Sequence, residues 1–97
     1  MNSSRVQPFR IDVDESVLED LRRRLASTRW PDALPGAEWD YGTSLDYAKE
    51  LCAHWRDAYD WREHEAALNA FPQFRAEIDG LGIHFIHARG IGPDPMP

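Results

Sequence analysis

The sequence has 97 residues, of which 42% are hydrophobic and four are tryptophan, and its formal net charge is −6. This length suffices for one small domain with a modest core, and the hydrophobic content is typical of a globular chain rather than a disordered one. The acidic balance argues against a nucleic-acid partner, because phosphate binding depends chiefly on a surplus of Lys and Arg.

The composition also indicates the cellular compartment. The single Cys52 cannot form an internal disulfide, which is typical of a reducing compartment. No stretch approaches the roughly 20 apolar residues of a membrane span, and "MNSSRVQPF" lacks the apolar run of a signal peptide. We therefore expect a cytoplasmic chain with no membrane partner.

The first predicted elements are a short strand and a helix. In "VQPFRIDV" apolar and polar residues alternate, and Pro8 restricts the segment to an edge strand or an unpaired one. Asp14 is the predicted N-cap of the helix, whose apolar stripe has spacings of three and four and comprises Leu18, Leu21 and Leu25. Acidic residues lie three and four positions before Arg22–Arg24, which favours an ion-paired helix face over a basic patch.

Two further helices are predicted after an irregular segment. The second helix begins at Thr43 or Ser44, and its apolar stripe comprises Ala48, Leu51, Cys52, Trp55 and Tyr59. Asp60 and Glu63 have capping-box spacing at the start of the third helix, which Pro72 ends. The residues expected to point inward from the third helix are Trp61, Leu68 and Phe71.

The hydrophobic period then changes from that of a helix to that of a strand. In "FRAEIDGLGIHF" the dipeptide Asp79-Gly80 is a strong signal for a two-residue hairpin turn. Such a turn places three apolar pairs on one face, namely Ile78 with Leu81, Ala76 with Ile83, and Phe74 with Phe85. A two-stranded hairpin alone is marginally stable, so we expect a third strand after Pro97 and interpret the chain as interrupted there.

The residues that could carry chemistry favour no reaction. His54 and His64 fall on different helices, and His84 and His87 point to opposite faces of a strand, so no pair suits one metal ion. Cys52 lies in an apolar helix stripe, where a thiol usually acts as a small core residue. The glycines of "GLG" and "GIGP" lack the Lys and the helix start of a phosphate-binding loop. We therefore predict no metal site, no cofactor and no catalytic residue.

One irregular segment resists a simple structural interpretation. "STRWPDALPGAEWDYGT" is longer than most loops of a compact domain, yet it carries Trp30, Pro31, Trp39 and Tyr41. Aromatic residues in such a segment need a hydrophobic surface, and three short helices offer little. We expect these four residues to pack on a surface outside this chain.

Several motifs together resemble a known family. The ordered series "PFRIDV", "TRWPD", "WDYG", "LDYAKELCAHWRDAYDWREHEAALNAFPQF" and "IDGLGIHFIHAR" is similar to the N-terminal region of epoxide hydrolases of the microsomal and juvenile-hormone type. The resemblance extends from about Val6 to Arg89. It implies an α/β-hydrolase in which an aspartate attacks the epoxide, a histidine with an acidic partner activates water, and two lid tyrosines hold the epoxide oxygen. None of these roles falls on a residue of this chain.

The fold class that the resemblance implies is an α+β fragment. Residues 1–72 would form the helical and meandering N-terminal region, and residues 73–97 the first β-hairpin of the hydrolase sheet, truncated before the third strand. The expected partner is the remainder of the α/β-hydrolase domain, with self-association through the exposed hairpin edge when that partner is missing. The alternative is a stand-alone helical binding module, or a non-functional remnant, derived from such an enzyme.

Overall fold

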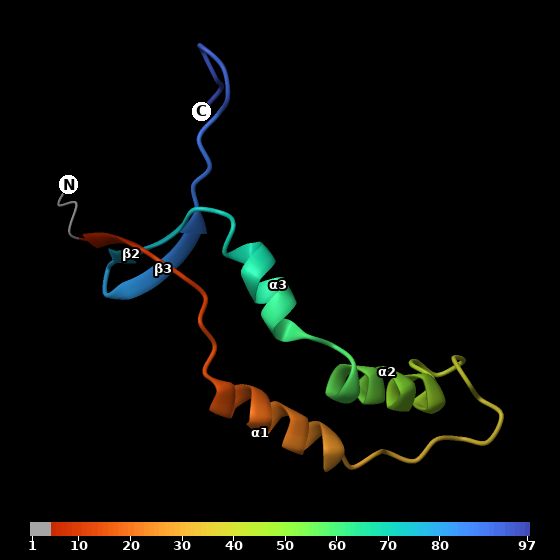
Figure 1. Ribbon diagram of the computed structural model, residues 1–97. Helices are drawn as coiled ribbons and strands as arrows, with labels where there is room; N and C mark the ends of the chain where they lie inside the picture. Colours follow the sequence, from red (N-terminus) through yellow and green to blue (C-terminus); the bar gives the residue numbers. More distant parts are fainter. Residues whose placement is uncertain (1–4) are drawn as a thin grey trace. The chain divides into compact units, whose positions relative to one another are not determined.

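A computed structural model describes residues 5–97 (Figure 1). The chain forms two compact units. One unit contains the segment up to Asp12 together with Trp61–Pro97, and the other contains Val13–Asp60. Residues 1–4, where the segment compared above with a signal peptide begins, lie outside the described residues.

The first unit is built on an antiparallel sheet with the strand order β1-β2-β3. The strands are β1 (Val6–Pro8), β2 (Gln73–Ile78) and β3 (Leu81–Ile86). β1 is an edge strand, as predicted, and pairs with β2 in a register that places Val6 opposite Ala76. The hairpin therefore already has a third strand beside it, whereas a third strand was expected from the sequence only after Pro97. The sheet gains its third strand from the beginning of the described chain, because Val6 and Gln7 can pair with β2 while Pro8, which has no N–H, lies at the end of the strand.

The predicted hairpin register is confirmed in all three apolar pairs. Asp79 and Gly80 have φ angles of 51° and 79°, the left-handed conformation that a type I′ turn requires at both central positions. Phe74 and Phe85 stack across the two strands with ring centroids 5.6 Å apart. Local turn chemistry and cross-strand packing thus agree.

Helix α3 (Trp61–Leu68) completes the first unit. It ends four residues before Pro72, because the N–H groups of Ala70 and Phe71 bond to carbonyls three residues back, which tightens the last turn. Phe71 consequently lies outside the helix and is half exposed, contrary to the prediction that it points inward. Leu68, also predicted to point inward, is 40% exposed, and the buried residue of α3 is Glu65.

The second unit contains α1 (Glu15–Ala26) and α2 (Leu45–Asp57), which contact each other. Asp14 occupies the predicted N-cap position of α1, but its carboxylate accepts a hydrogen bond from the Ser16 hydroxyl and does not cap the helix. The apolar stripe of α1 is confirmed, with Leu18 buried and Leu21 and Leu25 half-buried.

Helix α2 begins where it was predicted to begin, but its apolar side chains are less buried than predicted. The Ser44 side chain accepts a hydrogen bond from the Tyr47 N–H, so Ser44 and not Thr43 is the N-cap. No residue of α2 is buried, and the predicted stripe is only partly covered: Ala48 and Cys52 are half-buried, whereas Leu51, Trp55 and Tyr59 are 40–51% exposed. The apolar arc of α2 is wider than one neighbouring helix can cover.

Few apolar side chains are buried in either unit. Among residues 5–97, Leu18 and Ala76 are the buried hydrophobic residues, and no side chain is less than 2% exposed. Both units therefore present large apolar side chains to their surroundings.

Candidate functional site

The irregular segment between α1 and α2 keeps its aromatic side chains exposed. Trp30 is 36% exposed, Trp39 56% and Tyr41 82%, and Pro31 is also exposed. That these four residues pack against another part of the protein stays a prediction.

Trp39 joins this segment to α2. Its ring contacts the Tyr47 ring with centroids 5.2 Å apart and planes inclined by 53°. Leu51 and Trp55 follow Tyr47 at intervals of four residues, and both are exposed. Trp39 therefore extends an apolar surface of α2 that the sequence assigned to the core.

An open hollow of about 530 Å³ lies between the irregular segment and the start of α2. Its lining includes Tyr41, Leu34 and three carboxylates, those of Asp32, Glu38 and Asp46, with no Lys or Arg. Such a hollow does not suit an anionic ligand.

The first unit holds a polar cluster centred on Gln73, which is 5% exposed. The Gln73 amide donates to the Leu68 carbonyl oxygen at 2.7 Å, so its own oxygen is free to accept from His84 Nε2 at 2.9 Å. His84 Nε2 must then carry the hydrogen. The Phe9 ring lies edge-on to His84 at 5.2 Å. The cluster links the end of α3 to β3.

A second polar link joins α3 to the segment after β1. Asn69 accepts a hydrogen bond from the Ile11 N–H and donates one to the Ile11 carbonyl oxygen, each 2.8 Å long. One side-chain amide thus satisfies both backbone groups of a residue 58 positions away, as a paired strand would.

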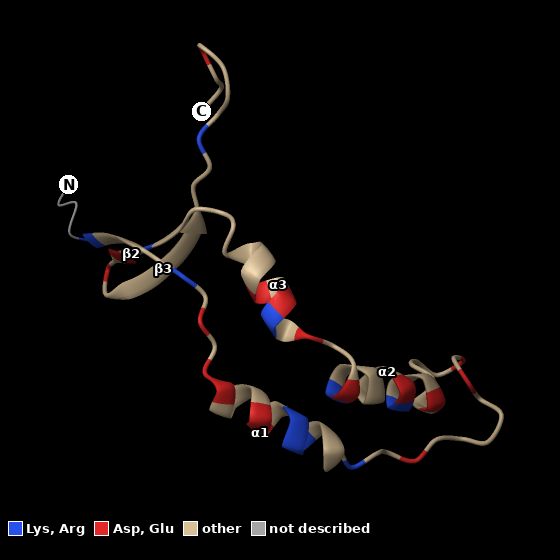
Figure 2. Ribbon diagram, viewed as in Figure 1, with Lys and Arg blue, Asp and Glu red and all other residues tan. Residues whose placement is uncertain are grey.

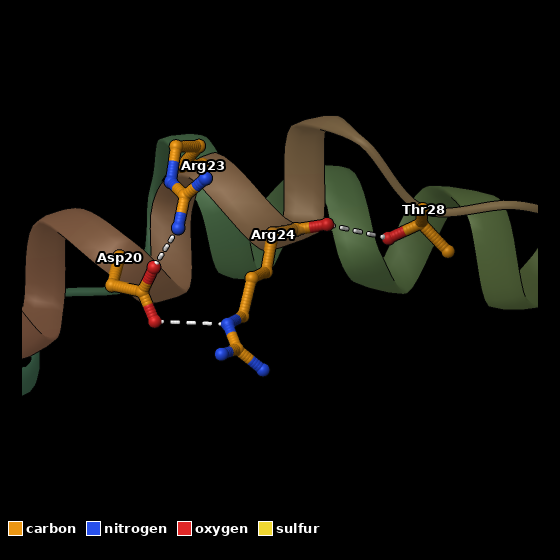
Figure 3. A network of polar contacts seen from close by, with 4 residues as sticks. All are labelled: Asp20, Arg23, Arg24 and Thr28. Carbon is orange, nitrogen blue, oxygen red and sulfur yellow. Dashed lines mark hydrogen bonds and ion pairs between the residues drawn. The ribbon is translucent and has the colours of Figure 1, made fainter.

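The charged residues of α1 pair along its exposed face, which confirms the prediction for Arg22–Arg24. Acidic residues occupy the first half of the helix and basic residues the second (Figure 2). Charges in this order interact favourably with the helix dipole. Asp20 accepts hydrogen bonds from Arg23 and, at 2.8 Å, from Arg24, and Thr28 Oγ1 donates to the Arg24 carbonyl oxygen (Figure 3). The hydrogen bond from Arg23, aided by the charge of Arg24, lowers the pKa of Asp20.

The residues considered for chemistry do not converge. His84 lies opposite Arg75 in the register, while the His87 ring lies near Phe74, so the two histidines are on opposite faces of the sheet. Within residues 5–97 no group of three or more His, Cys, Asp or Glu side chains could hold a metal ion. None of the helices described there is long and apolar enough to cross a membrane.

Comparison with known proteins decides the family. The family described as "Epoxide hydrolase N terminus" matches residues 6–97. The chain belongs to this epoxide hydrolase N-terminal family. A Stigmatella aurantiaca protein, provisionally named an epoxide hydrolase, is 47% identical over 92 residues, which are 95% of this chain and 21% of the relative. Juvenile hormone epoxide hydrolase 1 of Ctenocephalides felis is 37% identical over 87% of this chain and 18% of its own length.

Solved epoxide hydrolases contain the same fold. The juvenile hormone epoxide hydrolase of the silkworm Bombyx mori superposes with a TM-score of 0.81 and 28% identity, over 91% of this chain and 23% of that one. The Aspergillus niger epoxide hydrolase gives a TM-score of 0.76 and 31% identity, over 82% of this chain and 22% of that one. The chain thus spans about a fifth of these relatives, in which the matching segment belongs to a larger hydrolase.

Three features of this epoxide hydrolase segment were not predicted from the sequence. Leu51 and Trp55 were expected in a core but are exposed, and the hydrogen bonds of Asn69 and of Gln73 were not foreseen. The signal for Asn69 and Gln73 was the presence of an uncharged polar residue on each side of Pro72, where buried amides can satisfy backbone groups.

Proposed function

We propose that this chain is the N-terminal segment of an epoxide hydrolase that converts an epoxide and water to a vicinal diol, and that its part is to support the hydrolase domain. The observation that carries the proposal is the exposed apolar surface of a segment that makes up about a fifth of each relative. Monomeric proteins rarely leave large contiguous apolar patches uncovered, and the missing cover is the rest of such an enzyme.

In this proposal the segment has two parts. Residues 1–72 form the helical and meandering N-terminal region, and residues 73–97 begin the α/β-hydrolase sheet with the hairpin of β2 and β3. Trp30, Pro31, Trp39 and Tyr41 pack against the hydrolase domain, and their exposure in the described chain supports that assignment. Pro31 favours an extended backbone at Trp30, which would hold the Trp30 ring ready for a pocket at a modest cost in entropy.

The free edge of β3 is a second surface that would contact the hydrolase domain in this proposal. Among the described residues β3 pairs only with β2, so its outer edge carries backbone groups available to a further strand of the hydrolase sheet. In the isolated chain this edge is a template for pairing between copies. We expect the isolated chain to associate at high concentration and to bind a hydrophobic dye. Sedimentation that shows a monomer at every concentration, with no dye binding, would contradict this expectation.

The catalytic groups belong to the remainder of the enzyme in this proposal. The 97-residue chain alone is therefore expected to hydrolyse styrene oxide no faster than buffer. Diol formation that survives rigorous purification, and that disappears when an Asp or His of this chain is replaced, would overturn that statement.

A chimera tests the supporting role directly. In the chimera, the matching 92 residues of the Stigmatella aurantiaca relative are replaced by this chain, and the control is the same relative with those residues deleted. We expect the chimera to be expressed as a stable protein that forms diol from styrene oxide, and the deletion to be unstable or insoluble. A deletion variant as stable and active as the chimera would refute the proposal.

A further inference from the structure

Helix α2 carries apolar residues on two adjacent faces. Ala48 and Cys52 are half-buried, and α2 contacts α1. Tyr47, Leu51 and Trp55 lie on the neighbouring face and are 48%, 51% and 44% exposed. The contact with α1 therefore leaves a second apolar face of the same helix uncovered.

This second face has the geometry of a packing ridge. Residues four apart on a helix form a row inclined by about 26° to its axis, and from Tyr47 to Trp55 the row is about 12 Å long. The Trp39 ring against Tyr47 lengthens it. We call Trp39, Tyr47, Leu51 and Trp55 the α2 ridge.

The α2 ridge is uncharged, which restricts what can cover it. At 100° per residue, Asp46, Lys49 and Asp57 fall on the far side of α2 from Leu51, whereas Glu50 and His54 border the ridge. An ionic contact with a charged partner is thus not built into the ridge, and burial of its apolar surface is the available source of binding energy.

We propose that the α2 ridge packs against a helix of the hydrolase domain, and that this helix crosses α2 at about 50°, the angle produced when i±4 rows of two helices interdigitate. This inference rests on the proposed function. The relatives extend far beyond the matched segment, which is 21% of the Stigmatella aurantiaca protein, so a large attached domain is the nearest source of such a helix. Pairing between copies is expected at the free edge of β3, which leaves the ridge to the attached domain.

Thiol labelling tests whether the ridge is covered. Leu51→Cys is made in the chimera and in the 97-residue chain, both carrying Cys52→Ser, and the labelling rate of the peptide is followed by mass spectrometry. The matched control is Glu50→Cys, one residue away and about 100° around the helix. We expect Cys at position 51 to react at least about tenfold more slowly than Cys at position 50 in the chimera, and at a similar rate in the isolated chain. Equal rates at the two positions in the chimera would overturn the proposal.

A photoreactive label on the thiol at position 51 then identifies the partner. Captured residues of the hydrolase domain at intervals of three and four support a helix. Intervals of two, typical of a strand, would overturn it, as would capture of a second copy. Activity of the unlabelled chimera separates the two proposals: an active, stable chimera with an accessible position 51 leaves the proposed function standing and refutes only the ridge contact.

Discussion

Asn69 offers a direct test of how the first unit is held together. Its side-chain amide forms two 2.8 Å hydrogen bonds with the backbone of Ile11, across 58 residues of sequence. Asn69→Ala removes both bonds. Each is worth about 0.5–1.5 kcal/mol net, so the segment that follows β1 should lose roughly 1–3 kcal/mol of local stability.

The amide of Ile11 reports this loss because Asn69 Oδ1 is its acceptor. A loss of about 1–3 kcal/mol corresponds to an exchange of that amide with solvent that is roughly five- to 150-fold faster. NMR-detected hydrogen exchange on the 97-residue chain, labelled with ¹⁵N, measures it. The control substitution is Ala66→Ser, at an exposed position of α3.

The Phe9 amide is the internal reference, because it donates to the Gln73 carbonyl oxygen at 2.8 Å and not to Asn69. We expect its exchange to increase far less than that of Ile11. Unchanged exchange at Ile11 in Asn69→Ala would show that the two bonds contribute nothing. Equal acceleration at Ile11 and Phe9 would show a global loss of structure, and the reasoning about a local link would be wrong.

Three further substitutions have defined outcomes. Trp30→Ala in the chimera should lower the free energy of unfolding by up to roughly 3–5 kcal/mol, the cost of a large aromatic lost from a filled pocket, and the melting temperature should fall with it. The kcat per folded molecule should change little, and a large fall in kcat at unchanged stability would show that the segment shapes the active site. Asp20→Asn should abolish a stabilisation of α1 that is present above about pH 4 and is lost as the pH falls through the lowered pKa of Asp20, so acid titrations of helix content that coincide for both proteins would refute it. Gly80→Ala should weaken the hairpin by about 1–2 kcal/mol, since Gly80 has a φ of 79°, and amide exchange in β3 equal to that of the unsubstituted chain would contradict this strain.

The features predicted correctly are those with a local cause. Ser44 caps α2 through the N–H of a residue three positions later, and Asp79-Gly80 turns the chain within two residues, which sets the whole register of β2 and β3. The ordered Trp and Pro motifs were equally local, and they led to the family that the comparison then established. In each instance the deciding contacts, or the deciding pattern, lie within a few residues.

The features that sequence reasoning missed depend on partners far along the chain or outside it. The pairing of β1 with β2 and the bonds of Asn69 join residues 6–11 to residues 69–76, and no periodicity reports such a distant contact. For α2, the apolar period correctly marks which residues avoid water, but burial needs a second surface. The structure shows that α1 covers one face of α2 and leaves Leu51 and Trp55 exposed. Hydrophobic pattern alone determines that a face will be covered, and only tertiary packing decides what covers it, because the hydrophobic effect has no direction.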